Sequence, residues 1–197
     1  MVMHYGKIVA GPKFSIDHPK IRSQYEQFFY YFMASQPDFD EDKRRSFAEK
    51  TTLDPKKAIL LVGDIGVGKS VIMRVFNMIF RRYKYVHARR QIERTFKEFG
   101  QVEFLREYGY DLKMSLCIDD VGTEETEQMH YGNKISLIGE LLLERYDLFK
   151  SQPEYVTHLV SNLTTNQMEE RYGKRNFDRL KESSNLVTWT GASLRQA

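Results

Sequence analysis

The eight-residue stretch Gly63-Asp64-Ile65-Gly66-Val67-Gly68-Lys69-Ser70 constrains this chain more than any other. It fits the pattern G-x-x-x-x-G-K-[ST], in which backbone N–H groups of a glycine-rich loop surround the phosphates of a nucleotide. Glycine permits this turn because it adopts positive φ without a side-chain clash. An apolar run before the loop predicts a buried strand, and the apolar spacing after it predicts a helix. The pattern therefore predicts binding of a nucleoside triphosphate.

Positions of this loop have expected roles. Lys69 is expected to reach the β- and γ-phosphates of ATP, and Ser70 to bind Mg²⁺. The new helix points the positive end of its dipole at the same anion, so its first turn belongs to the site. The alternative is a glycine-rich turn that matches the pattern by chance. The predicted nucleotide-binding residues are Gly63, Asp64, Ile65, Gly66, Val67, Gly68, Lys69, Ser70 and Val71.

The composition is that of an ordinary globular protein. Of the 197 residues, 41% are hydrophobic and 29% are charged, which is typical of soluble domains. No apolar run approaches the roughly 20 residues that a membrane span needs, and the N-terminus lacks the apolar core of a signal peptide. The single cysteine, Cys117, excludes an internal disulfide. We therefore expect a cytoplasmic protein with no membrane partner.

A second informative segment is the apolar run 114–118, which ends in Asp119 and Asp120. An apolar strand that ends in two carboxylates, roughly fifty residues after a phosphate-binding loop, indicates a Mg²⁺ site. Asp119 is expected to hold Mg²⁺ through water, and Asp120 to orient and deprotonate the attacking water. Hydrolysis, and not binding alone, is therefore expected.

Asn162 follows another expected strand, 155–161. A polar residue at the tip of a strand beside the two aspartates can position the water or contact the γ-phosphate. Asn is also a favoured cap for a helix that starts near Thr164. The residues alone leave both interpretations open.

A basic segment surrounds the second expected strand, 83–87. The net charge of +3 is too small to indicate a nucleic-acid partner by itself. Interleaved cations and aromatic rings are the pattern of a surface for single-stranded DNA. A solvated helix face with its rings in the core gives the same pattern, so both interpretations stay open. The residues are Arg81, Arg82, Lys84, Arg89, Arg90, Arg94 and Lys97, with Tyr83, Tyr85, Phe96 and Phe99.

Helices are expected over 19–35, 91–108 (broken near Gly100), 133–150, 165–173 and 174–182. The first carries an aromatic stripe that either packs in the core or docks a partner. Residues 122–132 are expected to form a solvated acidic loop with Glu124, Glu125 and Glu127. A last strand is expected over 186–190.

The alternation of strands and helices predicts an α/β fold with a parallel sheet covered on both faces. Ligands of such sheets bind at the carboxyl ends of the strands, where the loop, Asp119 and Asn162 are expected to meet. We divide the chain into an N-terminal segment, 1–50, and a nucleotide-binding core, 51–197.

The segments GDIGVGKS, LCIDDVG, the strand ending in SNL, RYGKRNFDRL and the terminal GASLR together resemble the AAA+ ATPases of the DnaC/IstB type. That family comprises loaders of bacterial replicative helicases and helper ATPases of transposition, and the resemblance covers roughly residues 55–195. It implies a P-loop NTPase three-layer sandwich with a parallel five-stranded sheet. Two departures from many AAA+ proteins are expected: the chain lacks a C-terminal helical lid, and its N-terminal segment is short.

The resemblance also implies roles for particular residues. Asn162 takes the sensor-1 position, and Arg195 matches a sensor-2-like arginine. Arg179 matches the arginine finger, which stabilises charge on ATP bound by a neighbouring subunit, with Arg175 less favoured. Such a finger implies a homo-oligomer when ATP is bound. The alternative is that Arg175 and Arg179 pair with acidic residues on a surface helix.

We therefore expect a Mg²⁺-dependent ATPase that resembles DnaC-type helicase loaders and contacts single-stranded DNA. In initiator-type relatives, helices that track single strands are inserted where this chain has its basic segment. A replicative helicase or a transposase is the expected protein partner. The alternatives are an IstB-type transposition helper, a nucleotide switch without catalysis and a small-molecule kinase.

Overall fold

The computed structural model describes residues 1–125, 128–130 and 133–194, with the side chains of 128–130 and 133–135 left out. The chain folds into two compact units. The N-terminal unit contains residues 1–57 and 70–82, and the sheet unit contains residues 58–69 and the chain from Tyr83 onward. The predicted boundary near residue 50 stays a prediction.

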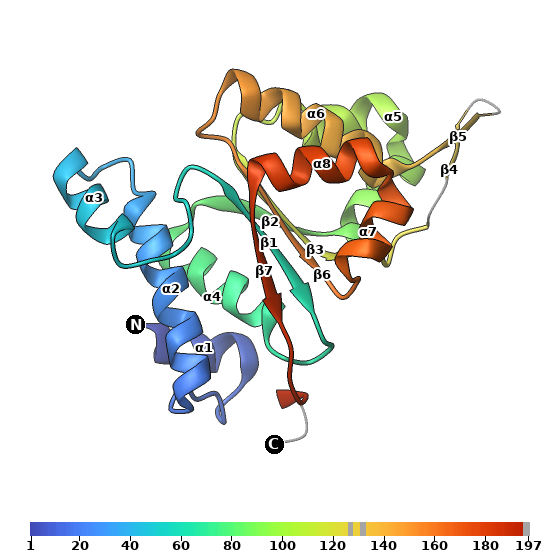
Figure 1. Ribbon diagram of the computed structural model, residues 1–197. Coiled ribbons are helices and arrows are strands. Elements are labelled where there is room, and N and C mark those ends of the chain that lie inside the picture. Colours follow the sequence, from blue (N-terminus) through green and yellow to red (C-terminus); the bar gives the residue numbers. More distant parts are fainter. Residues whose placement is uncertain (126–127, 131–132, 195–197) are drawn as a thin grey trace. The chain divides into compact units, whose positions relative to one another are not determined.

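A five-stranded sheet forms the centre of the sheet unit (Figure 1). The strands lie in the order β2-β3-β6-β1-β7, and every neighbouring pair is parallel. Their carboxyl ends therefore meet at one edge. The predicted α/β class and five-stranded parallel sheet are confirmed. The strands are β1 (Ala58–Gly63), β2 (Tyr83–His87), β3 (Ser115–Val121), β6 (Thr157–Ser161) and β7 (Ser184–Trp189).

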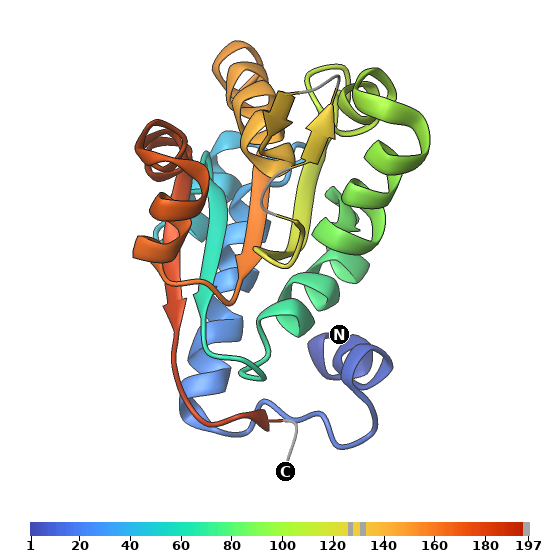
Figure 2. The ribbon, with the colours of Figure 1, turned by 90° about the vertical axis from the view of Figure 1, so that its right-hand side faces the viewer.

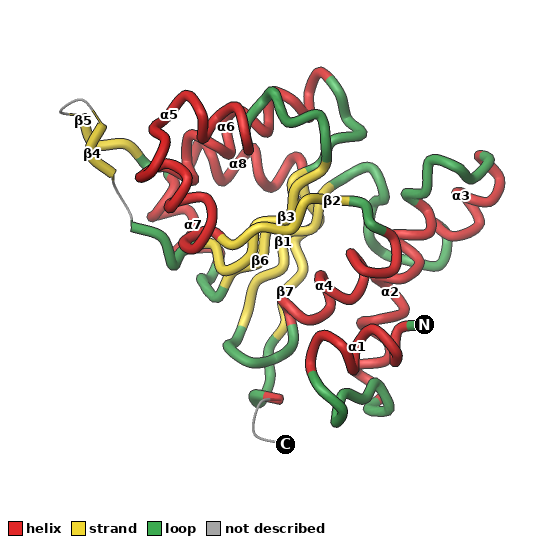
Figure 3. Tube along the Cα trace, turned by 180° about the vertical axis from the view of Figure 1, so that it is seen from behind, coloured by secondary structure: helices red, strands yellow, loops and turns green. Residues whose placement is uncertain are grey.

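Helices of the sheet unit cover one face of this sheet (Figure 3). Apolar side chains that alternate along the strands, such as Leu60 and Val62 of β1, are buried against them, because successive residues of a strand point to opposite faces. The helices are η1 (Ala88–Glu93), α5 (Arg94–Tyr108), α6 (Leu137–Ser151), α7 (Thr165–Tyr172) and α8 (Lys174–Ser183). The break predicted in α5 is confirmed at Gly100, which has φ of +80°.

The predicted loop 122–132 and the first residues of the helix expected over 133–150 are wrong in part. β4 (Gln128–His130) and β5 (Asn133–Ile135) pair as an antiparallel hairpin, which extends from the sheet unit away from its five-stranded sheet (Figures 1 and 3). Helix α6 begins only at Leu137, because the Ser136 hydroxyl caps it by accepting from the Gly139 N–H at 3.3 Å.

The N-terminal unit is helical. It contains α1 (Val2–Ala10), which lacked a periodic sequence pattern, then α2 (Pro19–Ala34), α3 (Glu41–Ala48) and α4 (Lys69–Phe80) from Ser70 onward. The aromatic stripe of α2 packs within this unit: the ring centroids of Phe28 and Phe32 lie 6.3 and 5.4 Å from that of Phe76 in α4. The stripe is therefore a core feature, as the first of its two interpretations predicted.

Candidate nucleotide-binding site

The loop after β1 has the backbone conformation that its glycines predict. Gly63, Gly66 and Gly68 have φ of +136°, +84° and +95°, a region that side chains disfavour. A Cβ atom on Gly63 would lie 1.8 Å from the carbonyl oxygen of Trp189 in β7. The turn therefore needs glycine both for its dihedral angles and for its close approach to the neighbouring strand.

Lys69 lies at the end of this loop and is only 5% exposed. Its ammonium donates hydrogen bonds to the carbonyl oxygens of Gly63 at 2.8 Å and Asp64 at 2.7 Å, and to Oδ1 of Asn162 at 2.7 Å. The structure thus brings together two predicted site residues that are far apart in the sequence. The contact places a cation where the loop is expected to hold phosphate.

The geometry around Asn162 separates the two interpretations that the sequence left open. Thr164 caps α7, because its hydroxyl accepts from the Gln167 N–H while the Gln167 side chain accepts from the Thr164 N–H. The Asn162 side chain instead accepts from Lys69. Asn162 therefore lies at the candidate site, and its sensor role stays a prediction.

A β-bulge shapes the end of β3. Ile118 pairs with Leu159 of β6, but the next pair joins Val121 to Ser161, so two residues of β3 lie opposite one of β6. Asp120, in the bulge, has φ of +54°, a conformation that Asp tolerates better than most residues. Bulges redirect side chains and are frequent beside active sites.

The two aspartates have different partners. Asp119 is buried, and its Oδ2 accepts a hydrogen bond from the Tyr85 hydroxyl at 2.5 Å. Oδ2 of Asp120 lies 2.8 Å from Nε2 of His87. A buried carboxylate at the carboxyl edge of the sheet is an oxygen ligand of the kind that Mg²⁺ prefers, so Asp119 fits its predicted role.

Sequence reasoning missed Tyr85 and His87 as site residues. Both lie on β2, two residues apart, and therefore on one face of the strand. The adjacency of β2 to β3, with His87 opposite Asp119, brings them to the aspartates. A strand alternation in the sequence could have shown their shared face, but not which strand lies beside it.

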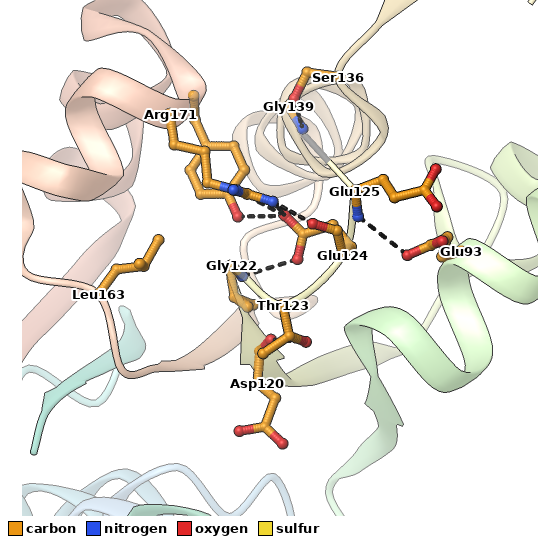
Figure 4. Close-up of polar contacts among 12 residues, drawn as sticks. Glu93, Asp120, Gly122, Thr123, Glu124, Glu125, Ser136, Gly139, Leu163 and Arg171 are labelled. Atoms are coloured by element: carbon orange, nitrogen blue, oxygen red, sulfur yellow. Dashed lines mark hydrogen bonds and ion pairs between the residues drawn. The ribbon is translucent and has the colours of Figure 1, made fainter. Parts of the chain in front are cut away.

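Glu124 corrects the prediction of a solvated acidic loop (Figure 4). It is only 5% exposed, and its carboxylate accepts from the Gly122 N–H at 2.8 Å, the Tyr172 hydroxyl at 2.6 Å and Nε of Arg171 at 3.2 Å. Burial and the nearby Glu124 raise the pKa of the Tyr172 phenol. The acid is buried because α7 supplies a cation from 47 residues away.

Glu125 agrees with the prediction in part. Its side chain is exposed and pairs with Lys97 at 3.0 Å, while its backbone N–H donates to the buried Glu93 at 3.1 Å. Figure 4 shows residues 122–125 lying between Glu93 and Arg171. Glu127 lies outside the described residues.

The arginines predicted to act on ATP make no described contact with the other candidate site residues. In the part of the chain that the structure describes, Arg179 makes no hydrogen bond or ion pair with Lys69, Asp120 or Asn162. Neither Arg175 nor Arg179 forms an ion pair with a described acidic residue, so the surface-pair alternative lacks support. Arg195 lies outside the described residues.

The segment before Arg195 returns to the loop (Figure 2). The Leu194 N–H donates to the Gly66 carbonyl oxygen at 2.9 Å, and the Gly191 N–H donates to Oδ2 of Asp64 at 3.0 Å. Ser70 and Val71 belong to the first turn of α4 and to the N-terminal unit. Their contacts with nucleotide and Mg²⁺ stay predictions.

The basic segment forms a smaller candidate surface than expected. Lys84, Arg94 and Lys97 pair with acidic side chains, and Arg81 and Arg82 belong to the N-terminal unit. Two of the aromatic rings, Tyr83 and Phe96, are buried, and Tyr85 bonds Asp119. The exposed remainder of the segment on the sheet unit is Arg89, Arg90 and Phe99, the last 65% exposed.

No protein-family model matches this chain, and no curated protein matches it. Solved structures do. A protein of Streptococcus pyogenes serotype M3, described as a candidate primosome component, matches with a TM-score of 0.59 at 14% identity, over 98% of this chain and 97% of that one. Domain III of the Thermotoga maritima replication initiation protein DnaA matches with a TM-score of 0.51 at 16% identity, over 93% and 65% of the two chains. The DnaC helicase loader matches with a TM-score of 0.47 at 15% identity, over 81% and 98%.

None of the described helices has the length and apolar character to cross a membrane. At these identities the structural matches show the fold. The chain has an α/β fold similar to that of DnaA domain III, with the five-stranded parallel sheet that the sequence predicted.

Proposed function

We propose that this protein is a cytoplasmic, Mg²⁺-dependent ATPase of the AAA+ type that acts in DNA replication in the manner of DnaC-type helicase loaders. The observation that carries the proposal is the arrangement of Lys69, Asn162 and Asp119 at the carboxyl ends of β1, β6 and β3. A buried lysine on a glycine loop, a polar residue at the tip of a strand and a buried acid are the parts that phosphoryl transfer needs.

The chain's own residues divide this chemistry. Lys69 exchanges its bonds to loop carbonyls for bonds to phosphate oxygens. Bound Mg²⁺ would neutralise charge on the phosphates, and Asp119 is the residue of the sheet unit that would hold it. Asp120 takes the proton of the attacking water, and Asn162 helps to orient that water. The His87 contact holds the Asp120 carboxylate on the side of β2.

Assembly follows from the role proposed for Arg179. A guanidinium stabilises the transferring phosphoryl when it is supplied by a neighbouring subunit, and no hydrogen bond or ion pair among the described residues joins Arg179 to Lys69, Asp120 or Asn162 of its own subunit. We therefore propose a homo-oligomer in the ATP-bound state. Arg89, Arg90 and Phe99 are the proposed contacts for single-stranded DNA, since exposed cations can bind phosphate and an exposed ring can stack on a base. The proposed protein partner is a replicative helicase.

Steady-state ATP hydrolysis with and without single-stranded DNA tests this function, with Lys69→Ala as the blank and Lys113→Ala as a matched surface control. Turnover that needs Mg²⁺, is lost in Lys69→Ala and rises with DNA is expected. Equal turnover in Lys69→Ala would overturn the assignment of the site. Turnover that does not change with DNA would refute the proposed DNA contact and favour a nucleotide switch controlled by a protein partner.

A further inference from the structure

We propose that Tyr146 is a positioning residue for Arg179, a platform that holds the guanidinium ready to act on ATP bound by a neighbouring subunit. The inference rests on the proposed trans role of Arg179. It concerns the contact between α6, which carries Tyr146, and α8, which carries Arg179. The sequence motifs did not predict this contact.

The contact is a cation stacked on a ring. The guanidinium carbon of Arg179 lies 4.9 Å from the centroid of the Tyr146 ring, within the range of an attractive cation–π interaction. Phe177 and Leu180 of α8 are buried in the core of the sheet unit beside Arg179, and Leu142 of α6 is buried in the same core. The backbones that carry the ring and the cation are therefore fixed by packing.

The ring is itself held in place. The Tyr146 hydroxyl donates to Oε2 of Glu182 at 2.7 Å, and Lys150 donates to Oε1 of the same carboxylate at 3.0 Å. Glu182 lies three residues after Arg179 on α8. The hydrogen bond to Glu182 raises the pKa of the Tyr146 phenol.

A platform matters because an arginine side chain has many rotamers and must otherwise lose them when it meets the phosphate. Arg175, one turn earlier on α8, is exposed and has no ring beneath it among the described residues. The two arginines therefore differ in preorganisation. This difference favours Arg179 as the trans-acting residue.

A mixing experiment separates the subunit that supplies the arginine from the subunit that binds ATP. Receiver subunits carry Arg179→Ala and can bind ATP, whereas donor subunits carry Lys69→Ala and retain Arg179. Neither sample should turn over ATP alone, and the mixture should. Tyr146→Leu is then added to the donor in one mixture and to the receiver in another.

We expect Tyr146→Leu to lower turnover about three- to fivefold when it is in the donor, and to leave turnover unchanged when it is in the receiver. Tyr146→Phe, which keeps the ring, should retain most of the activity in either position. Tyr110→Leu is the matched control, because it removes a ring whose centroid lies 3.8 Å from Nζ of Lys113, on a connection remote from α8 in the sequence. Thermal unfolding of each variant checks that the subunits are folded.

The outcomes distinguish this inference from the function on which it rests. If mixing restores no turnover, the trans role of Arg179 fails. If mixing restores turnover and Tyr146→Leu donors match unmodified donors, the platform alone is refuted. Equal losses in donor and receiver would show a purely structural role for Tyr146, and a gain of turnover would show that the ring holds Arg179 back. Either result overturns the positioning role.

Discussion

Arg145 and Lys69 are both buried cations of the sheet unit, and both donate hydrogen bonds to neutral oxygens, but in different settings. Arg145 of α6 is 2% exposed and donates to the carbonyl oxygens of Gly109, Leu112 and Met114 at 3.2, 2.8 and 2.7 Å. Its Nε donates to the Thr157 hydroxyl at 2.8 Å. Lys69 donates to two carbonyls of a glycine loop and to one amide side chain.

The two cations differ in the backbone that surrounds them. Arg145 ties the connection between α5 and β3 to β6, and its planar fork matches carbonyls whose positions are set by the fold. Burial lowers the pKa of Arg145 to about 10, which leaves it charged at neutral pH. Lys69 is a point charge at the end of a loop shaped for an anion. The comparison teaches that burial and neutral partners do not by themselves identify a ligand site, whereas the shape of the surrounding backbone does.

Removing Lys69 gives the largest effect that the comparison predicts. Lys69→Ala should lower ATP turnover by on the order of 10³-fold, because phosphate loses its charged ligand. The free energy of unfolding should change little or rise, since a buried charge is removed. Steady-state hydrolysis and chemical denaturation measure these two quantities, and calorimetry measures the affinity for ATP. If Lys69→Ala bound ATP as tightly as the wild type, the claim that Lys69, unlike Arg145, belongs to a ligand site would be refuted.

Removing Arg145 should have the opposite result. Arg145→Met should lower the free energy of unfolding by about 3 kcal/mol, because the carbonyls of the α5–β3 connection lose their donors. ATP turnover per folded molecule should be retained. Chemical denaturation and active-site titration measure the two quantities. Loss of turnover in a sample that unfolds normally would place Arg145 with the site instead.

A third buried base, His158 of β6, sharpens the comparison through pH. Burial lowers its pKa to about 3, and its Nδ1 accepts from the Ile59 N–H at 3.0 Å. The unfolded chain therefore binds this proton near pH 6.5 and the folded chain does not. Stability is complete above pH 6.5 and falls as pH drops, by about 2 kcal/mol at pH 5.

His158→Asn keeps an acceptor for Ile59 but does not titrate. Between pH 6.5 and 5, the unfolding free energy of His158→Asn should depend less steeply on pH than that of the wild type. The difference in slope should correspond to the uptake of about one proton on unfolding. Parallel pH profiles for His158→Asn and wild type would show that His158 is protonated in the folded protein.

The smallest expected effect comes from His87, which contacts Asp120. His87→Ala should lower turnover about fivefold with unchanged ATP affinity, because one hydrogen bond that orients the carboxylate is lost. His87→Gln, which retains a donor, should recover part of that loss. Steady-state kinetics at saturating ATP give the comparison, and a higher turnover in His87→Ala would show that the pair restrains Asp120.

The sequence was sufficient where the relevant residues are neighbours along the chain. The glycine loop, its strand and its helix are one contiguous segment, so their pattern contains the whole of the local geometry. The apolar runs predicted β1, β3 and β6, because these central parallel strands are buried on both faces.

The remainder depends on contacts between distant segments. The bulge at Asp120 exists because β3 pairs with β6, and His87 reaches Asp120 because β2 lies beside β3. Glu124 has the local sequence of a solvated loop, and its burial is made favourable by Arg171 and Tyr172 of α7, which are distant in the sequence. The aromatic rings of the basic segment were equally ambiguous, since the same pattern serves a core or a surface.

The close packing around the glycine loop affects how far its glycines can be used to judge whether a related protein is active. A Cβ atom on Gly63 would meet the Trp189 carbonyl, and one on Gly66 would lie 2.2 Å from the Ser193 hydroxyl oxygen. Architecture alone therefore excludes larger residues at these two positions, whatever the loop binds. A descendant of this chain that had lost catalysis would still retain both glycines. Its activity would be better judged from Lys69 and Asp119, whose charges are the ones proposed to act on phosphate and Mg²⁺.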